Sequence, residues 1–334
     1  MAAELHPPTD VPGWQVVHEL GREYGTYRRG QYLLPHDERE RVKLDMTHTV
    51  FKLIRPFGSC RLTNVPTERL SLSEAGQLTT PLPLGMRPRV LDLGCGTGIW
   101  MNEMAREFPQ AEFVGVDIHR LWSQCQPPNV SARIWDYEQP WALGERSWDM
   151  IHLQMGLGSV SDWPSLYSKI IQHLIPGSGC FESVEIDFEP RCDDGSMQPG
   201  KFTELWGTYL KNIFQSINRP IHYDPNTGDI LRAIGFKDVH HMVYKVPFNM
   251  WSSDRQEWKA GQWWAQIMSR GRNNDGGNGM DALTLAALCK HQNWSVPDVE
   301  AISQAVVEEA TNPACHGYNN VHVWWGRAPD IGEV

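Results

Sequence analysis

A glycine-spaced turn follows a short apolar run at residues 90–98, which read VLDLGCGTG. The glycines at 94, 96 and 98 carry no Cβ, so the backbone can approach a ligand closely, and the helix that follows begins with unpaired N–H groups. Such a turn can hold a nucleotide-like ligand, although a tight connection between a strand and a helix has the same composition. Its spacing departs from the dinucleotide fingerprint GxGxxG, which argues against NAD.

Two carboxylates follow the next two apolar runs. Asp117 ends the run FVGVD, 23 residues after Gly94, where a carboxylate can accept hydrogen bonds from both ribose hydroxyls of a ligand. Asp136 follows RIW, where a side-chain oxygen can accept from an adenine amino group. Either acid alone is explained equally well as a helix N-cap or a solvated loop residue. The glycine turn and both acids in this order favour a nucleoside site.

The elements that must position these residues alternate between apolar runs and helical patterns. Short apolar strands separated by helices of about ten residues are typical of an α/β fold, with a parallel sheet covered on both faces. The expected strands are 89–93, 112–116, 133–135, 148–153, 179–186, 236–246 and 320–326. The expected helices are 37–55, 99–108, 163–174, 201–218 and 226–234.

The pattern also predicts how the chain is divided. Residues 1–57 are expected to form a leader and a helical lid, and 58–88 a long loop rich in Pro, Ser, Thr and Gly. Residues 89–328 then form the main domain, with a helical insertion at 254–310 between the last two strands. Within that insertion, the Gly/Asn-rich stretch 270–280 is expected to be a mobile linker.

Composition narrows the function classes. Among 334 residues, 30 Lys and Arg stand against 40 Asp and Glu, and the net charge of −10 argues against direct nucleic-acid binding. No stretch reaches about 18 uninterrupted apolar residues, so no membrane span or secretory leader is expected. Seven widely spaced cysteines without a CxxC pair favour reduced thiols, with neither a disulfide framework nor a metal site.

The glycine turn LDLGCGTG resembles the first motif of the class I S-adenosylmethionine-dependent methyltransferases. Longer stretches resemble the LaeA family of fungal regulators of secondary metabolism, from about residue 24 to 328. They are YGTYRRGQYLLPHDERERVKLDMTH, LDLGCGTGIW, SWDMIHLQMGLGSVSDWPSLY, EIDFEPRCDD and YNNVHVW. These outer stretches are more diagnostic than the glycine turn, which many unrelated enzymes share.

This resemblance implies a seven-stranded, mostly parallel sheet with a reversed last strand. It also implies that the protein binds S-adenosylmethionine, releases S-adenosylhomocysteine, and works with velvet-family proteins in a nuclear complex that couples light to development and secondary metabolism. A nuclear location, with the cytoplasm as a second one, follows from the resemblance alone. The sequence has no Lys/Arg-rich stretch of the kind that directs nuclear import. Entry into the nucleus together with a partner would explain a nuclear location without such a signal.

The resemblance also assigns the donor contacts. The glycine turn should line the methionine portion of the donor. Asp117 should bind the ribose, and Asp136 with Tyr137 should contact the adenine. The end of the fourth strand, from Leu153 to Met155, should form the wall beyond. Tyr24 and Arg28 should close over the donor's amino-acid end, because an aromatic hydroxyl and a guanidinium can both donate to its carboxylate. The predicted donor-binding residues are Tyr24, Arg28, Gly94, Cys95, Gly96, Asp117, Ile118, Asp136, Tyr137, Leu153, Gln154 and Met155.

Methyl transfer is an in-line displacement, which needs a base only when the acceptor has a proton to lose. His152 and Glu185, near the ends of two strands, are the candidates for a base, and a structural role explains each of them as well. Met155 offers a thioether nucleophile that needs no deprotonation, so the protein could methylate itself there. The alternative for Met155 is a flexible side chain that fills a gap in the core.

Fifteen tryptophans are many for this length, and two pairs are adjacent, Trp263 with Trp264 and Trp324 with Trp325. Core packing explains most of them, and an aromatic-lined acceptor pocket or a protein interface is the alternative.

Three functions therefore stay open. They are a regulatory methyltransferase acting on a protein, a biosynthetic methyltransferase acting on a small fungal metabolite, and a donor-binding module without catalysis.

Overall fold

The computed structural model describes residues 15–28, 30–55, 87–269 and 279–332. The expected leader at 1–13, nearly all of the 58–88 loop and most of the 270–280 linker lie outside the described residues.

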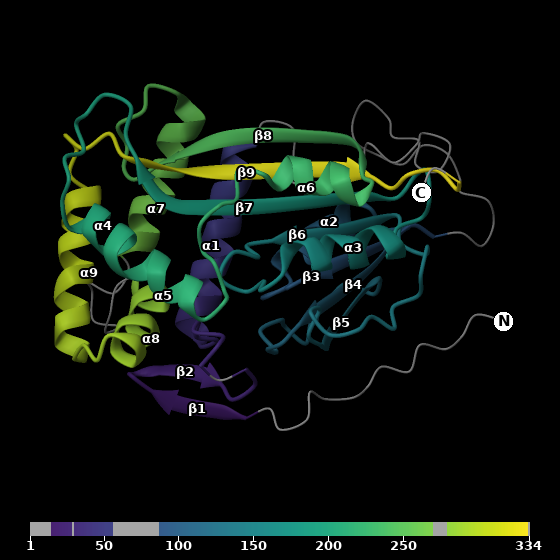
Figure 1. Ribbon diagram of the computed structural model, residues 1–334, viewed down its shortest axis with the longest axis horizontal. Coiled ribbons are helices and arrows are strands. Elements are labelled where there is room, and N and C mark those ends of the chain that lie inside the picture. The colour runs from purple at the N-terminus through teal and green to yellow at the C-terminus, as the bar shows by residue number, and fades with distance from the viewer. Residues whose placement is uncertain (1–14, 29, 56–86, 270–278, 333–334) are drawn as a thin grey trace.

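A seven-stranded sheet runs through the protein in the order β5-β4-β3-β6-β7-β9-β8 (Figure 1). The strands from β5 to β7 pair in parallel, whereas β9 runs antiparallel to both β7 and β8. The strands are β3 (Arg89–Leu93), β4 (Glu112–Asp117), β5 (Val130–Ile134), β6 (Met150–Gln154), β7 (Cys180–Arg191), β8 (Lys237–Pro247) and β9 (Tyr318–Arg327). The mostly parallel sheet with one reversed strand is thus confirmed.

The strand order explains where a ligand can bind. From β3 the chain proceeds outward through β4 to β5, and then returns to place β6 on the other side of β3. At such a switch point the loops leave in opposite directions and open a crevice at the carboxyl ends of the strands. The central strands are held by apolar packing, since Leu91 pairs with Val114 on one side and Ile151 on the other. All three lie within one apolar cluster.

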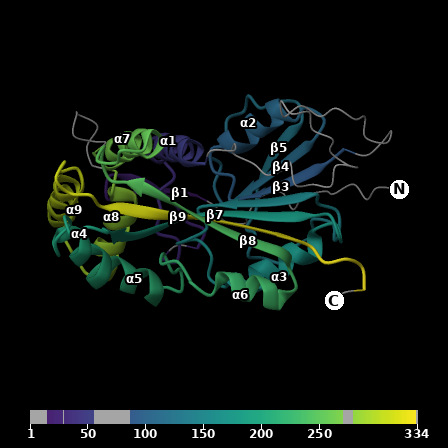
Figure 2. The same cartoon turned by 90° about the horizontal axis from the view of Figure 1, so that it is seen from above.

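Helices cover both faces of the sheet, as the view from above shows (Figure 2). One face carries α1 (Glu38–Ile54), α2 (Ile99–Glu107) and α7 (Arg255–Ser269), and the other carries α3 (Trp163–His173) and α6 (Thr227–Ile234). The start of α1 is capped by Asp37, whose side chain accepts from the Glu40 N–H. Arg55, directly after α1, forms a buried ion pair of 2.9 Å with Glu182 of β7, so this helix is anchored to the sheet.

A group of helices gathers beyond one end of the sheet (Figure 1). It consists of α4 (Lys201–Glu204), the π-helix η2 (Leu205–Leu210), α5 (Lys211–Ser216), α8 (Asp281–His291) and α9 (Val296–Ala310). With α1 and α7 they enclose a large apolar cluster that also includes side chains of β7 and β9. Helices α7, α8 and α9 lie where the insertion at 254–310 was expected.

Two local features differ from the sequence-based expectation. A short hairpin of β1 (Val16–Glu19) and β2 (Arg22–Gly25) precedes α1, where only a leader and a helix were predicted. Its strands are too short for alternation to be informative, and its turn depends on Leu20 and Gly21, both with positive φ. Strand β5 begins three residues earlier than expected, because it is an edge strand whose outer side chains are not apolar.

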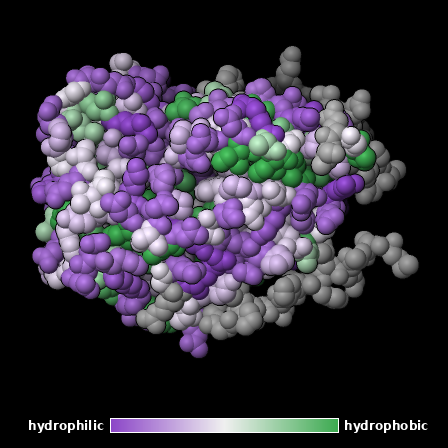
Figure 3. All heavy atoms as spheres, in the orientation of Figure 1, coloured by the Kyte–Doolittle hydropathy of each residue, from purple (hydrophilic) through white to green (hydrophobic). Residues whose placement is uncertain are grey.

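The face seen in Figure 3 is mostly hydrophilic, with an apolar strip in the region of α6. Across the described ranges, no helix combines the length and apolar character needed to cross a membrane.

Candidate active site

A pocket opens at the carboxyl ends of β3, β4, β5 and β6, at the switch point of the sheet. It is lined by every predicted donor residue except Tyr24 and Cys95. These side chains come from five separate segments, and the parallel sheet brings them to one edge. Their contacts with a donor remain a prediction, which the geometry below supports.

The glycine turn after β3 is held in a conformation that favours glycine. Gly94, Gly96 and Gly98 have φ values of 68°, 52° and 75°. The turn is fixed from below, because the Gly94 N–H donates to Val116 O at 2.8 Å and the Gly96 N–H to Asp117 Oδ2 at 2.8 Å. A Cβ on Gly96 would lie 3.6 Å from Leu44, on the pocket side of the turn. Side chains here would be strained and would fill the space in which the donor's methionine portion is predicted to bind.

Asp117 sits beneath this turn at the end of β4. Its two oxygens accept from the N–H groups of Gly96 at 2.8 Å and His119 at 2.9 Å. Burial raises the pKa of Asp117 to about 6, and the nearby Asp92 adds to the rise, while the two backbone N–H groups oppose it. Each oxygen has a further lone pair with which to accept from a ribose hydroxyl. The residue therefore fits the role expected of it.

Asp136 follows β5 and is buried in a network with the N-terminal segment. It accepts from Tyr27 Oη at 2.8 Å, Arg28 Nε at 2.8 Å and the Glu138 N–H at 2.9 Å. Arg28 also pairs with Glu138 at 2.5 Å. Arg28 lines the pocket, but its guanidinium is held by the two carboxylates beyond β5, so its contact with the donor's amino-acid end stays a prediction.

Tyr24 and Cys95 lie outside the pocket. Tyr24 belongs to β2 and is buried in the helical cluster, where the Lys290 ammonium lies 5.0 Å from its ring. The Cys95 side chain packs beneath the glycine turn in the cluster around α2. The geometry thus does not support a donor-binding role for either side chain.

His152 is a structural residue of β6. It is fully buried, its Nδ1 lies 2.8 Å from Asp92 Oδ1, and its ring stacks on Trp100 with centroids 3.7 Å apart. Its Nε2 is 3.9 Å from the buried Glu182 carboxylate. The ring does not line the pocket, so the geometry does not support the catalytic role predicted for His152.

Glu185 acts on the loop after β6 rather than on a ligand in the pocket. Its carboxylate accepts from the N–H of Gly156 at 2.9 Å and of Leu157 at 3.0 Å. Burial raises its pKa to about 7, although those two N–H groups favour the charged form. Glu185 does not line the pocket, so the geometry does not support the role as a base predicted for it. It is a positioning residue for the segment that begins at Met155.

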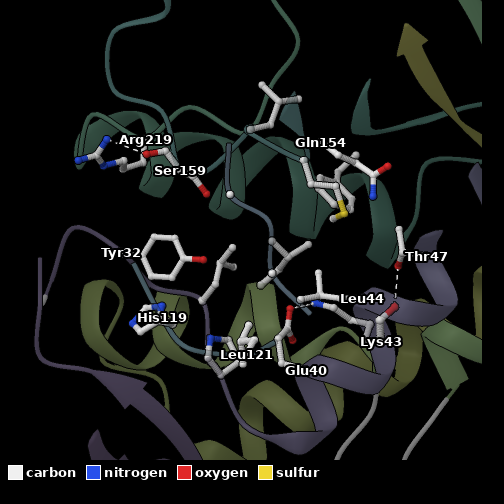
Figure 4. Close-up of a pocket in the computed structure, with 18 of the residues that line it drawn as sticks. Tyr32, Glu40, Lys43, Leu44, Thr47, His119, Leu121, Gln154, Ser159 and Arg219 are labelled. Carbon is white, nitrogen blue, oxygen red and sulfur yellow. Dashed lines mark hydrogen bonds and ion pairs between the residues drawn. The ribbon is translucent and has the colours of Figure 1, made fainter. Parts of the chain in front are cut away.

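Sequence reasoning missed a whole wall of the pocket, formed by α1. Figure 4 shows Glu40, Lys43, Leu44 and Thr47 facing the space from this helix, with Lys43 paired to Glu40 at 2.6 Å. Their spacing of three to four residues places them on one helical face, which is the signal that could have revealed them.

The opposite wall carries Tyr32, His119, Ser159 and Arg219 (Figure 4). Arg219 Nη1 donates to Ser159 O at 2.8 Å and also pairs with Glu138 at 2.5 Å. Burial, with a further contribution from His36, lowers the pKa of His119 to about 3, so this ring is neutral. These residues lie in loops far apart in the chain, and no spacing signal connects them.

Comparison with known proteins places this geometry in a family. Residues 67–298 match the family model described as a methyltransferase domain. The chain is 39% identical to the secondary metabolism regulator LAE1 of Cochliobolus heterostrophus, over 93% of this chain and 94% of that protein. It is 38% identical to the protein-methionine methyltransferase laeA of Emericella nidulans, over 94% of this chain and 77% of that protein.

Among solved structures, the chain is similar to Haemonchus contortus phosphoethanolamine N-methyltransferase 2 in complex with S-adenosyl-L-methionine. The match has a TM-score of 0.43 and 16% identity, and covers 90% of this chain and 59% of that one.

We predict that Asp117→Ala weakens donor binding by about 1.5–3 kcal/mol, the usual scale for hydrogen bonds to a charged group. Isothermal titration with S-adenosylhomocysteine measures this, with Asp229→Ala on the exposed face of α6 as the control. An unchanged dissociation constant in Asp117→Ala would refute the ribose assignment.

The pH dependence of binding tests the same carboxylate. The ionised form accepts two ribose hydroxyls, so binding should weaken as the pH falls through about 6 and Asp117 takes up a proton. Asp117→Asn cannot titrate and should lose this dependence. If Asp117→Asn keeps the wild-type profile, another group is responsible.

Proposed function

Because the chain belongs to the LaeA/LAE1 family of S-adenosylmethionine-dependent methyltransferases, we propose that it methylates the thioether of its own Met155. We propose further that this reaction serves the regulation of secondary metabolism, the role that the names of its relatives give.

The observation that supports this proposal most directly is the left-handed backbone conformation of Met155 at the edge of the pocket. Met155 follows the last residue of β6, lines the donor pocket and has a φ of 61°. This left-handed conformation is uncommon for a residue with a side chain, and such strain concentrates at functional sites. Its N–H donates to Val184 O at 2.9 Å, and the Glu185 carboxylate holds the next two N–H groups. The main chain that carries the thioether is thus fixed at the edge of the pocket.

The charges of the pocket suit an acceptor that needs no base. Among the described lining residues, each carboxylate already has a cation or an N–H partner. Glu40 pairs with Lys43, Glu138 pairs with Arg219, and Asp117 accepts backbone N–H groups. A thioether attacks through a sulfur lone pair, so no proton has to be removed.

The reaction balances without a further reagent. A lone pair of Met155 Sδ forms a bond to the donor's methyl carbon while the bond between that carbon and the donor's sulfonium sulfur breaks. The electron pair stays on the departing sulfur, which gives neutral S-adenosylhomocysteine, and the positive charge moves to Met155. The part of the protein is to align the two sulfurs about the methyl group. A relative of this chain is named a protein-methionine methyltransferase, which agrees with this acceptor.

We also propose that the protein works in the nucleus with velvet-family partners. The support is the resemblance of its outer stretches to the LaeA family, together with its acidic charge, which disfavours direct binding to DNA.

Incubation with S-adenosylmethionine should add the mass of one methyl group to the purified protein, located at Met155 by peptide fragmentation. Met155→Leu should gain no mass and still bind the donor, because leucine fills a similar volume without a sulfur. Met250→Leu, at an exposed methionine outside the pocket, is the matched control and should be methylated normally. An equal mass gain in Met155→Leu would refute the proposal.

Glu185→Gln should slow methylation of Met155 by about tenfold or more, with little change in donor affinity. The amide offers one acceptor for two N–H groups, so the loop is held less firmly, and small misplacements of a nucleophile cost rate steeply. Glu189→Gln, on the exposed part of the same strand, should leave the rate unchanged. Equal rates for both variants would contradict the positioning role.

Immunoprecipitation of the tagged protein from fungal nuclei should recover velvet-family proteins, and fluorescence imaging should place it in the nucleus. This part of the proposal would be contradicted if no velvet-family protein were recovered from an extract in which these proteins are abundant. It would also be contradicted if the protein were excluded from nuclei.

A further inference from the structure

The pocket extends beyond Met155 into a space enclosed by helices. We call the set Phe202, Trp206, Leu210, Trp264, Met268 and Leu283 the helical chamber; all six side chains line the pocket and are buried. The Met155 side chain packs against the same apolar cluster, so it borders both the donor half of the pocket and this chamber.

Two chamber residues come from a π-helix. Trp206 and Leu210 lie on η2, where the Lys211 N–H donates to Trp206 O, five residues back. Such segments are rare and occur frequently at functional sites, because the wider turn displaces side chains from the positions that an α-helix would give them. Here the wider turn lies where the helix borders the pocket.

Trp264 supplies a polar group that lacks a partner in the described part of the chain. The residue is 5% exposed, and its indole N–H meets no hydrogen-bond acceptor among the described residues. A buried donor without a partner is costly, and most are satisfied by another group or by a ligand. Since Trp264 lines the pocket, an acceptor oxygen within the chamber would satisfy it.

The chamber carries no charge of its own. Among the described lining residues from α4, η2, α7 and α8, none is charged. The charged groups of the pocket lie instead on α1 and around the donor half, as Lys43 and Asp136 do. An ionic group would lose its hydration in the chamber without gaining a partner, which excludes charged ligands.

We propose that the helical chamber binds an uncharged, ring-containing small molecule, one oxygen of which accepts the Trp264 N–H, next to the Met155 thioether. Aromatic walls and one polar anchor are typical of small-molecule sites. Binding there needs no methyl transfer, so this site can be tested apart from the reaction proposed for Met155.

The test uses 6-propionyl-2-dimethylaminonaphthalene, an uncharged two-ring probe with a ketone oxygen, whose emission depends on polarity and hydrogen bonding. The full chain is first saturated with S-adenosylhomocysteine, so that the probe cannot occupy the donor half. Saturable binding to the wild type is expected, and 2-naphthoate, a ring compound of similar shape with a negative charge, should not compete.

Trp264→Phe keeps an aromatic ring and removes the N–H, so it should bind the probe about three- to tenfold more weakly, with emission shifted to shorter wavelength. Trp258→Phe, on the same helix at a 40% exposed tryptophan, should match the wild type. Donor affinity, measured in the same samples, verifies that each variant is folded. The proposal would be overturned if the probe showed no saturable binding, if 2-naphthoate competed effectively, or if the two variants bound the probe equally well. Each of these outcomes is independent of the result for Met155.

Discussion

The buried carboxylate of Glu185 determines how the chain leaves β6, and the site depends on that geometry. Glu185 lies on β7, which pairs in parallel with β6, so its side chain reaches the two N–H groups that follow Met155. Gly156 makes this approach possible, because a Cβ there would lie 3.0 Å from Glu185 Oε1 and 2.7 Å from the Trp163 ring. The chain therefore turns sharply at Met155.

Asp117 serves the same purpose on the donor side. Like Glu185, it is a carboxylate at the end of a strand that accepts backbone N–H groups from a neighbouring turn, and burial raises the pKa of both. One fixes the glycine turn after β3, and the other fixes the loop after β6. Since β3 and β6 are neighbours in the sheet, the two fixed turns face each other across the switch point. The predicted donor site and the proposed acceptor, Met155, thus lie at the same edge of one sheet.

The sequence predicted the parts of this protein that repeat a local pattern. The glycine turn, Asp117 and Asp136 each follow an apolar run, and the ends of parallel strands meet at one edge, so their convergence could be expected. The direction of a side chain within a strand was harder to predict. His152 and Glu185 were taken for bases because they lie near strand ends, but only the structure reveals the Asp92 carboxylate beside one and the two N–H groups beside the other.

The remaining parts depend on contacts between distant segments. The ion pairs of Arg28 could not be predicted, because its partners, Asp136 and Glu138, lie over a hundred residues away in the sequence. The chamber wall formed by η2, α7 and α8 comes from three helices whose apolar patterns also suit a plain core. Trp264 could be noted in the sequence as one of an adjacent pair, but only the structure shows that its N–H has no partner among the described residues.

The distance between Met155 and the transferred methyl group bears most directly on the proposed chemistry. A crystal structure with a donor analogue in which an amine replaces the sulfonium methyl would give it. Attack by the thioether requires Met155 Sδ to lie about 3–3.5 Å from that amine, in line with the bond that breaks. A separation more than twice as large, or a thioether directed away from the donor, would contradict methyl transfer to Met155.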